Sequence, residues 1–359
     1  MIKNILIINP FGIGDVLFST PLLRAIKKKY PASSITYICN RRAYGALQHN
    51  PNISNLHIFE KDEYKKLWNE SKIECLKKIY SSIGTLNKEK FDVLVDMSLG
   101  HTFSMLLFFM SAIPVRIGLN YRNRGKFFTH KINVEGFTDK HVVEYYFELG
   151  RVLDLDVSDK RMELVVSGEE ERQANECLAQ NGISTDDRLC GIIPGCGASW
   201  GKSAIYRRWD ASKFAEVADR IADKYKYKIL ILGEAKELPL CMKTQADMRS
   251  NAVQLCGKTT LPQFAAILDR CDLVVTNDGG PLHMAVALGK KTVSVFGPVD
   301  ERVYGPYPPS DRHITVTSDE KCRPCYRNFR HKNCEAVKCL KKITSDEVFN
   351  AAEKLIAKA

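Results

Sequence analysis

The chain has 359 residues, of which 45% are hydrophobic and 26% charged, with 22 Gly, 14 Pro and 12 Cys. This length is typical of about two globular domains, and the composition excludes disordered, collagen-like and low-complexity proteins. Fifty-three Lys and Arg residues against 42 Asp and Glu residues give a formal net charge of +11, which indicates an acidic partner without identifying it.

In the first half of the chain, short apolar runs alternate with longer amphipathic segments. We expect strands at 5–8, 34–39 and 93–96 and a helix at 16–30. Strands that are apolar throughout and are followed by helices are typical of a parallel sheet covered on both faces. The longest apolar stretch, 103–115, is too short for a membrane span, which needs about 20 residues. Because the chain enters its first strand without a secretory signal, we expect a cytoplasmic protein with reduced thiols.

The alternation pauses between residues 151 and 169, where a short strand at 164–166 leads into a helix, and then it restarts. The further predicted strands are 189–193, 228–232, 273–276 and 292–296, and the predicted helices are 169–181, 211–224, 261–270, 281–288 and 345–359. We therefore expect an α/β protein with two Rossmann-like, doubly wound domains, 1–165 and 166–343, facing a central cleft.

The first candidate loop, Asn9-Pro10-Phe11-Gly12-Ile13-Gly14-Asp15, joins the first strand to its helix. Gly12 and Gly14 allow the backbone to turn sharply and approach a ligand, and the helix start offers free amides and a positive dipole end. Asp15 either caps this helix or faces the cleft as a functional carboxylate. Leu17 stands where a dinucleotide-binding fingerprint has its third glycine, which disfavours an NAD-dependent oxidoreductase.

A second loop of the same kind, Asn277-Asp278-Gly279-Gly280-Pro281-Leu282-His283, follows the predicted strand at 273–276. Glycines at a helix start suit a pyrophosphate, because the amides there point at the ligand. Asp278 and His283 fall on the first turns of this helix. They either contact the ligand or serve as a helix cap and a packed imidazole.

Cations follow a third strand end. Residues 193–200 read Ile-Pro-Gly-Cys-Gly-Ala-Ser-Trp and are followed by Lys202 and Arg207, either of which could neutralise a phosphate. The alternative is an exposed basic loop that Trp209 anchors to the next helix. Further along, Glu237 follows a predicted strand and is placed to accept a hydrogen bond from a ribose.

Four cysteines are clustered near the end of the chain as Cys322-x2-Cys325-x8-Cys334-x4-Cys339. Four thiolates that include a C-x2-C pair are typical of a closed, structural metal site. Zinc is the default metal, and iron accepts the same four-sulfur geometry. The alternative is a chance cluster of thiols.

Taken together, these segments resemble the bacterial heptosyltransferases, glycosyltransferase family nine. The family's N-terminal signature is similar to residues 9–26, its mid-chain motif to Pro194-Gly195 and Arg208-Trp209, and its donor-site segment to residues 277–289 and 296–298. The resemblance covers nearly the whole chain, from residue 5 to residue 340.

The resemblance implies a GT-B fold and an inverting transfer without a catalytic cofactor. The implied donor is ADP-L-glycero-β-D-manno-heptose (ADP-heptose), held by the C-terminal domain. The implied acceptor is the anionic lipopolysaccharide inner core, either Kdo-lipid A or a core heptose, held by the N-terminal domain with peripheral contact to the inner membrane face. The last helix, 344–359, is expected to pack back on the N-terminal domain.

The resemblance also assigns roles to single residues. Asp15 matches the proposed general base. The expected donor-binding residues are Lys202, Ser203, Arg207, Glu237, Asp278, Gly279, Gly280 and His283. The expected acceptor-binding residues are Gly12, Gly14, Arg116, Arg122 and Arg124, of which the arginines belong to a run, 116–131, with five basic residues and no acidic one.

Two departures from the family pattern bear on the donor, because Arg207 stands where lysine is common and Gly279 where some members carry a hydroxyl. One branch of the family heptosylates protein autotransporters and holds iron at a cysteine cluster, which makes a protein acceptor the alternative. A basic, zinc-containing nucleic-acid-binding protein is a more remote alternative. The Gly- and Asp-rich loops argue against it, so we expect no nucleic-acid partner.

Overall fold

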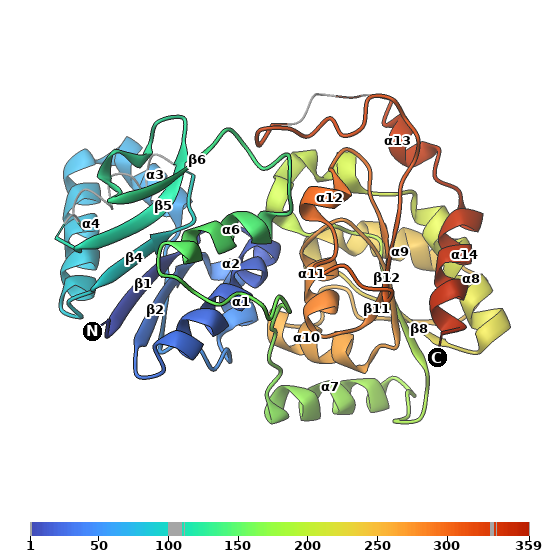
Figure 1. Cartoon of the computed structure of the whole chain (residues 1–359). Helices are drawn as coiled ribbons and strands as arrows, with labels where there is room; N and C mark the ends of the chain where they lie inside the picture. The colour runs from blue at the N-terminus through green and yellow to red at the C-terminus, as the bar shows by residue number, and fades with distance from the viewer. Residues whose placement is uncertain (1, 100–109, 111, 331–333, 335, 359) are drawn as a thin grey trace. The chain divides into compact units, whose positions relative to one another are not determined.

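The computed structural model describes residues 2–99, 110, 112–330, 334 and 336–358. The chain forms two compact units, Met1–Lys160 and Arg161–Ala359, and each contains one six-stranded sheet (Figure 1). Within the described residues, no helix combines the length and the apolar character needed to cross a bilayer.

The sheet of the first unit is parallel throughout, in the order β3-β2-β1-β4-β5-β6. Its strands are β1 (Asn4–Ile8), β2 (Ser34–Cys39), β3 (Asn55–Ile58), β4 (Val93–Asp96), β5 (Val115–Tyr121) and β6 (His130–Val134). The four isoleucine and leucine side chains of β1 from Ile5 to Ile8 are fully buried, as expected for a central parallel strand with helices on both faces.

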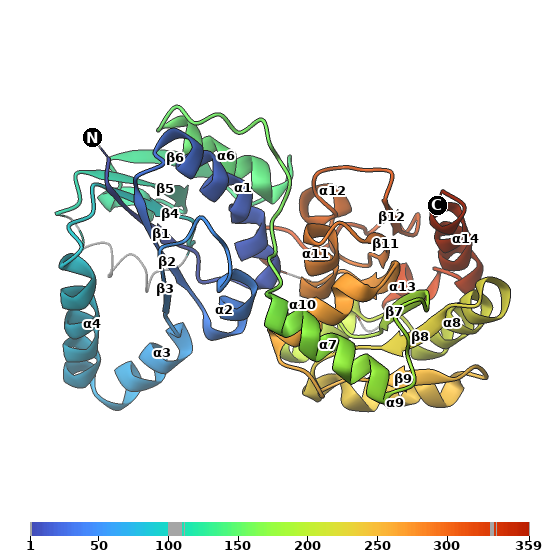
Figure 2. The same ribbon diagram turned by 90° about the horizontal axis from the view of Figure 1, so that it is seen from below.

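Helices cover both faces of this sheet (Figure 2). They are α1 (Ile13–Lys29), α2 (Arg41–Leu47), α3 (Lys61–Glu70), α4 (Lys72–Asn87) and α6 (Val142–Arg151), with a 3-10 turn η1 (Gly125–Phe127) after β5. Helices α3 and α4 pack on one face, where their apolar residues join Leu6, Ile8 and Leu94 in one core cluster. Helix α1 packs against α2 and α6.

The second unit repeats this plan, with a parallel sheet in the order β12-β11-β10-β7-β8-β9. Its strands are β7 (Leu189–Ile193), β8 (Lys228–Ile231), β9 (Ala252–Gln254), β10 (Leu273–Asn277), β11 (Lys291–Val295) and β12 (His313–Val316). Its helices are α7 (Gly168–Gln180), α8 (Ala211–Tyr225), α9 (Leu238–Asp247), α10 (Leu261–Arg270), α11 (Gly280–Ala287), α12 (Glu301–Tyr304), α13 (Lys338–Lys341) and α14 (Ser345–Ile356), with 3-10 segments η2 (Ala198–Arg207) and η3 (Ala235–Glu237).

The segment that joins the units differs from the sequence-based prediction. The run 164–166, predicted as a short strand, forms none, although Met162 and Leu164 are buried. Helix α7 then begins where predicted, because Ser167 and Glu170 form a reciprocal cap: the Glu170 amide donates to Ser167 Oγ (3.3 Å) and the Ser167 amide to Glu170 Oε2 (2.8 Å).

The last helix, α14, corrects a second expectation. It was expected to pack on the N-terminal domain, but it packs within the second unit, against α8 and strands β11 and β12. The red helix lies beside α8 in Figure 1. The reason is complementarity with α8: Phe349 is buried in the second core cluster, the Arg220 guanidinium lies 3.9 Å from its ring centroid, and Arg220 also pairs with Asp346 (2.7 Å).

Candidate functional site

In the first unit, the loop between β1 and α1 is fixed by two buried or half-buried asparagines. Asn9 is fully buried; its amide donates to Ile38 O, and its side-chain Nδ2 donates to Asp15 O, both at 3.0 Å. Asn40 Nδ2 donates to Pro10 O (3.0 Å). Asn9 follows β1 and Asn40 follows β2, so the backbone of this loop is held from the ends of two neighbouring strands.

Asp15 lies in the first turn of α1, because the helix begins at Ile13, three residues before the predicted start at 16. The Gly12 amide donates to Asp15 Oδ2 (3.1 Å), so the carboxylate caps the helix from its third position while its side chain remains partly exposed. Gly12 is the N-cap residue, and Gly14 is the second residue of the helix. A carboxylate here lies at the positive end of the helix dipole, which favours its ionised form.

A second carboxylate of this edge was missed by the sequence analysis. Asp96 ends β4, pairs in register with Ile8, is 1% exposed and accepts a hydrogen bond from the Ser98 amide at 2.6 Å. Burial raises the pKa of Asp96 from its ordinary value of 3.8 to about 7. The signal was present in the sequence as an aspartate at the end of an apolar run, but only the pairing of β4 with β1 places it beside Asn9.

The three arginines predicted to bind the acceptor have different surroundings. Arg116 Nε donates to Phe127 O (2.6 Å), so this guanidinium links β5 to the loop that follows it. Arg122 and Arg124 lie 4.9 and 5.5 Å from the ring centroid of Tyr121. Arg124 is half-buried and donates to Leu99 O, whereas Arg122 is exposed. The structure therefore groups Arg122 with Arg124, and of these two Arg122 is the more accessible.

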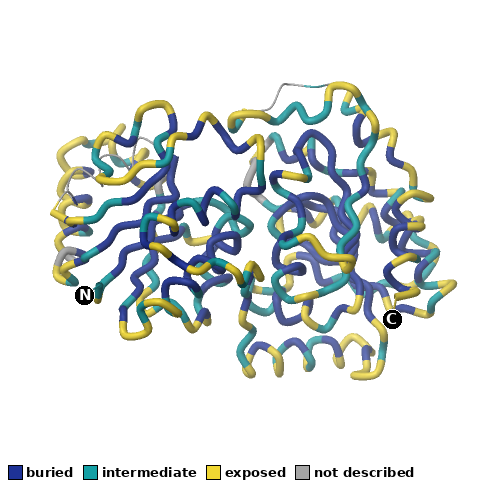
Figure 3. The backbone as a smooth tube through the Cα atoms, in the orientation of Figure 1, coloured by how far each residue is buried: buried dark blue, intermediate teal, exposed yellow. Residues whose placement is uncertain are grey.

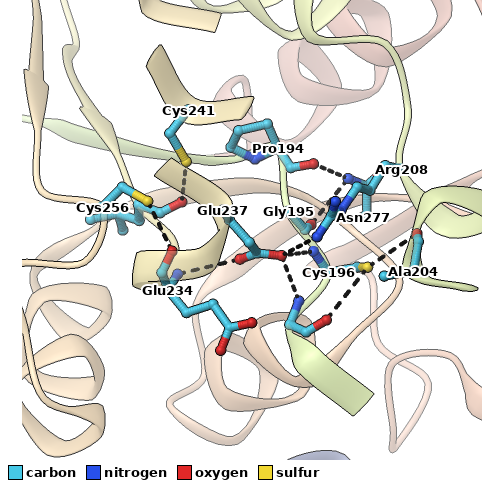
Figure 4. Close-up of polar contacts among 12 residues, drawn as sticks. Pro194, Gly195, Cys196, Ala204, Arg208, Glu234, Glu237, Cys241, Cys256 and Asn277 are labelled. Atoms are coloured by element: carbon cyan, nitrogen blue, oxygen red, sulfur yellow. Dashed lines mark hydrogen bonds and ion pairs between the residues drawn. The ribbon is translucent and has the colours of Figure 1, made fainter. Parts of the chain in front are cut away.

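In the second unit, the loops that follow β7 and β10 are tied together (Figure 4). Asn277, fully buried, donates through Nδ2 to Pro194 O (2.7 Å) and Gly195 O (3.1 Å). Its Oδ1 accepts from the Trp209 amide (2.9 Å). One side chain thus connects the end of β10, the loop after β7 and the residues directly before α8.

Glu237 completes this arrangement from η3. Its Oε1 accepts from the amides of Cys196 (2.9 Å) and Gly197 (3.0 Å) and from Arg208 (3.3 Å), and its Oε2 accepts from the Glu234 amide (3.3 Å). The residue is 2% exposed. The carboxylate therefore holds the 194–197 loop in place, while the ribose contact that the sequence suggested stays a prediction.

Arg207 and Asp278 form a buried ion pair at 2.8 Å, with side chains 9% and 3% exposed. Burial raises the pKa of Asp278, and the neighbouring Arg207 opposes that shift. His283 is buried three residues into α11, which begins at Gly280. Two predicted donor-site residues, Arg207 and Asp278, that are 71 positions apart in sequence thus meet at the carboxyl end of the sheet.

Close contact between the two loops requires glycine at position 279. A Cβ atom at Gly279 would lie 2.4 Å from Cys196 O, and one at Gly195 would lie 2.2 Å from the Glu237 carboxyl group. These approaches explain both glycines without a left-handed backbone conformation. Of the remaining predicted donor residues, Ser203 is half-buried in η2, and the side chain of Lys202 lies outside the described part of the structure.

The four clustered cysteines border one small cavity. Cys322, Cys325, Cys334 and Cys339 line a volume of about 70 Å³ together with Tyr206 and Pro298. Burial and the nearby Cys325 and Cys322 raise the pKa of the Cys339 thiol to about 11. Among the described side chains, however, no three His, Cys, Asp or Glu are arranged to hold a metal ion, so the metal site stays a prediction.

Comparison with known proteins extends these observations. The model of glycosyltransferase family 9 (heptosyltransferase) matches residues 79–335. A lipooligosaccharide heptosyltransferase 2 from Campylobacter jejuni is 26% identical over 97% of this chain and 96% of its own length. Two solved structures are similar: a family 9 glycosyl transferase from Veillonella parvula (25% identity, 99% and 98% of the chains, TM-score 0.82) and ADP-heptose lps heptosyltransferase II from E. coli (21%, 99% and 99%, 0.74).

The two parallel sheets and the loops at their strand ends define an α/β glycosyltransferase of GT-B type, which confirms the predicted fold class. The chain belongs to glycosyltransferase family 9, the heptosyltransferase family, and is a transferase.

Gly279→Ala tests the contact between the loops. The added methyl group must displace Cys196 O, so we expect a loss of about 1–3 kcal/mol in the free energy of unfolding and faster amide exchange at Cys196 and Gly197. Gly168→Ala is the matched control, because a Cβ there meets no atom within 4 Å. Equal stability of the two variants would contradict this account of the loops.

The raised pKa of Asp96 leads to a prediction of how the free energy of unfolding depends on pH. Its pKa is raised in the folded state, so between about pH 4 and pH 7 the folded chain retains a proton that the unfolded chain has lost, and stability falls as the pH rises. The slope due to this residue reaches about 1.4 kcal/mol per pH unit. Asp96→Asn keeps an acceptor for the Ser98 amide but cannot titrate. We therefore expect its free energy of unfolding, measured with urea at several pH values, to lack this pH-dependent component. A pH profile unchanged from that of the original chain would contradict the prediction.

Proposed function

We propose that this protein is an inverting heptosyltransferase that transfers a heptose from ADP-L-glycero-β-D-manno-heptose to the lipopolysaccharide inner core, Kdo-lipid A or a core heptose. The observation that carries this proposal is the pair of loops 194–197 and 277–280, held in contact by Asn277, Glu237 and two glycines. Membership of family 9 and the names of the relatives support the choice of sugar and acceptor.

The donor diphosphate is proposed to bind at the start of α11. Helix amides with a positive dipole end suit an anion, and Arg207, held by Asp278, supplies a positive charge beside Gly279 and Gly280. We assign contacts with the rest of the donor to Lys202, Ser203, Glu237 and His283. As the glycosidic bond to the diphosphate breaks, these cations and amides stabilise the negative charge on the leaving ADP.

Asp15 is the proposed general base. The acceptor hydroxyl oxygen forms a bond to the anomeric carbon from the face opposite the diphosphate, Asp15 takes the hydroxyl proton, and ADP leaves, which inverts the anomeric centre. The Gly12 amide holds one carboxylate oxygen and thereby fixes the direction in which the group points. No catalytic cofactor enters this sequence of events.

The acceptor is proposed to bind the first unit near Gly12 and Gly14 and to the basic residues Arg122, Arg124 and Arg116. Exposed Arg122 suits a direct bond to a Kdo carboxylate or a core phosphate. Arg116 holds the neighbouring loop through Phe127 O and so acts mainly by positioning. We place the enzyme in the cytoplasm, with peripheral contact to the inner face of the inner membrane.

We also propose a structural zinc or iron ion at the four-cysteine cluster. All four side chains line one cavity, and four thiolates suit either metal. Tyr206, next to Arg207, lines the same cavity. The Cys325 and Tyr326 amides both donate to Pro298 O (3.0 Å). The ion would therefore brace the segment that carries Arg207 and contribute stability rather than chemistry.

The proposed reaction is tested by ADP release from ADP-heptose, with and without Kdo-lipid A or heptosylated core. We expect release to depend on the acceptor. In Asp15→Asn, which keeps the cap on α1 but removes the base, we expect transfer to fall by at least about 100-fold while calorimetry shows ADP affinity within a few-fold of the original.

The controls separate the parts of this proposal. Loss of ADP binding in Asp15→Asn would make Asp15 a structural residue. Release with a protein acceptor instead of core oligosaccharide would support the autotransporter branch of the family, and no release with any acceptor would disprove the assigned donor and acceptor.

The metal is tested with Cys325→Ser and with chelation. We expect metal analysis to find one zinc or iron ion per chain, and both treatments to lower the melting temperature by several degrees while turnover per folded molecule changes less. Cys177→Ser, in α7 and outside the cluster, is the control. Equal melting temperatures with and without chelator would rule out a structural metal.

A further inference from the structure

Helices α3 and α4 of the first unit expose large apolar side chains. Trp68 near the end of α3 is 36% exposed, and Ile73, Leu76 and Tyr80 of α4 are 68%, 39% and 72% exposed. We call these four residues the α3–α4 stripe. Exposed segments of both helices are yellow in Figure 3. The Lys72 ammonium, 6.0 Å from the Trp68 ring centroid, links the end of α3 to the start of α4.

The stripe is separate from the face that α4 uses for folding. Cys75, Ile79 and Ile83 are buried in the core cluster of the first unit. Ile73, Leu76 and Tyr80 have the spacing i, i+3 and i+7 and therefore lie together on another side of the helix. One apolar face is sufficient to attach α4 to the sheet, and within the described part of the chain the second face is left exposed.

Basic side chains border the stripe. Residues 61–90 contain eight lysines against five Asp and Glu, and Lys65, Lys66, Lys72, Lys77 and Lys78 are exposed. Acidic residues pair with three of them, as Glu70 with Lys66 (3.8 Å), Glu74 with Lys77 (2.8 Å) and Glu63 with Lys78 (3.4 Å), which leaves a net positive surface.

The basic loop after β5 lies in the same layer of the first unit as helices α3 and α4. Phe127 and Phe128 pack against the core cluster that α3 and α4 form with the sheet, so this loop lies on the same face of the sheet as the two helices. Arg122, Lys126 and Lys131 in this part of the chain are exposed, and residues 116–131 contain no acidic side chain. The apolar stripe and the basic loop thus belong to elements on the same side of the sheet of the first unit.

We infer that this face docks on an anionic lipid bilayer, with the α3–α4 stripe at the level of the headgroups. Tryptophan and tyrosine favour that level, because their rings are apolar and their N–H and O–H groups reach water. Lysine stems cover apolar surface while their ammonium groups reach lipid phosphates. A second copy of this chain is a poorer occupant, because two net-positive faces repel each other. The inference rests on the proposed function, whose acceptor is lipid-linked, and adds the surface that meets the lipid.

Vesicle binding tests this inference without donor or acceptor. The probe is vesicles of phosphatidylethanolamine with phosphatidylglycerol, compared with phosphatidylcholine alone. We expect sedimentation with the anionic vesicles only, and quenching of Trp68 emission by brominated lipid. Ile73→Ser with Tyr80→Ser should weaken binding at least ten-fold at an unchanged melting temperature. The control pair is Leu238→Ser with Met242→Ser, which removes apolar side chains that are 38% and 58% exposed on the second unit.

The outcomes separate this inference from the proposed function. The stripe variant should transfer heptose normally to a delipidated core oligosaccharide but poorly to acceptor embedded in vesicles. Vesicle binding without any ADP release would leave the docking surface intact and remove the proposed reaction. Absence of vesicle binding, equal loss in the control pair, or a dimer that only the stripe variant disrupts would overturn the bilayer as the partner.

Discussion

The second unit depends on one buried asparagine. Asn277 binds the two carbonyl groups of Pro194 and Gly195 and accepts from the Trp209 amide, so it connects two strand ends and the segment before α8. An unpaired amide at full burial would be costly, and here each of its polar atoms is used. With this bond in place, Gly279 can lie against Cys196 O, and Arg207 meets Asp278. The proposed diphosphate site follows from that contact.

In the first unit, too, polar side chains hold a loop at the end of a strand by hydrogen bonds. Asn9 and Asn40 hold the loop before α1, and Gly12 and Asp15 close the first turn of the helix. Asp96 is buried at the end of the neighbouring strand β4, where it pairs in register with Ile8. A base that must accept a proton benefits from a fixed direction and a defined electrostatic surrounding. In both units, therefore, a buried asparagine, Asn9 or Asn277, holds the loop that carries residues proposed to do chemistry, and no substrate contact is assigned to either asparagine.

The positive charge of the chain has a structural distribution that fits an anionic, lipid-linked acceptor. Arg122 and Arg124 lie around Tyr121, and helices on the same side of the sheet carry the α3–α4 stripe and its lysines. Lys338 lines the cysteine cavity, where its positive charge would offset part of the charge of four thiolates. The basic residues of the first unit are thus proposed to meet a partner, whereas Lys338 is proposed to balance charge at a metal site.

The sequence by itself determined the α/β class, the glycine-rich strand ends and the family, because these depend on local patterns: apolar strands, glycines at turns, and motifs of fixed spacing. It also indicated that Asp15 lies at a helix start. Only the tertiary structure decided that α14 packs on α8, that Glu237 is occupied by four protein donors, and that Asp96 is a buried carboxyl group beside Asn9. Each of these depends on which distant segments meet, and neither helical periodicity nor strand alternation records the partner that an apolar face or a carboxylate will find.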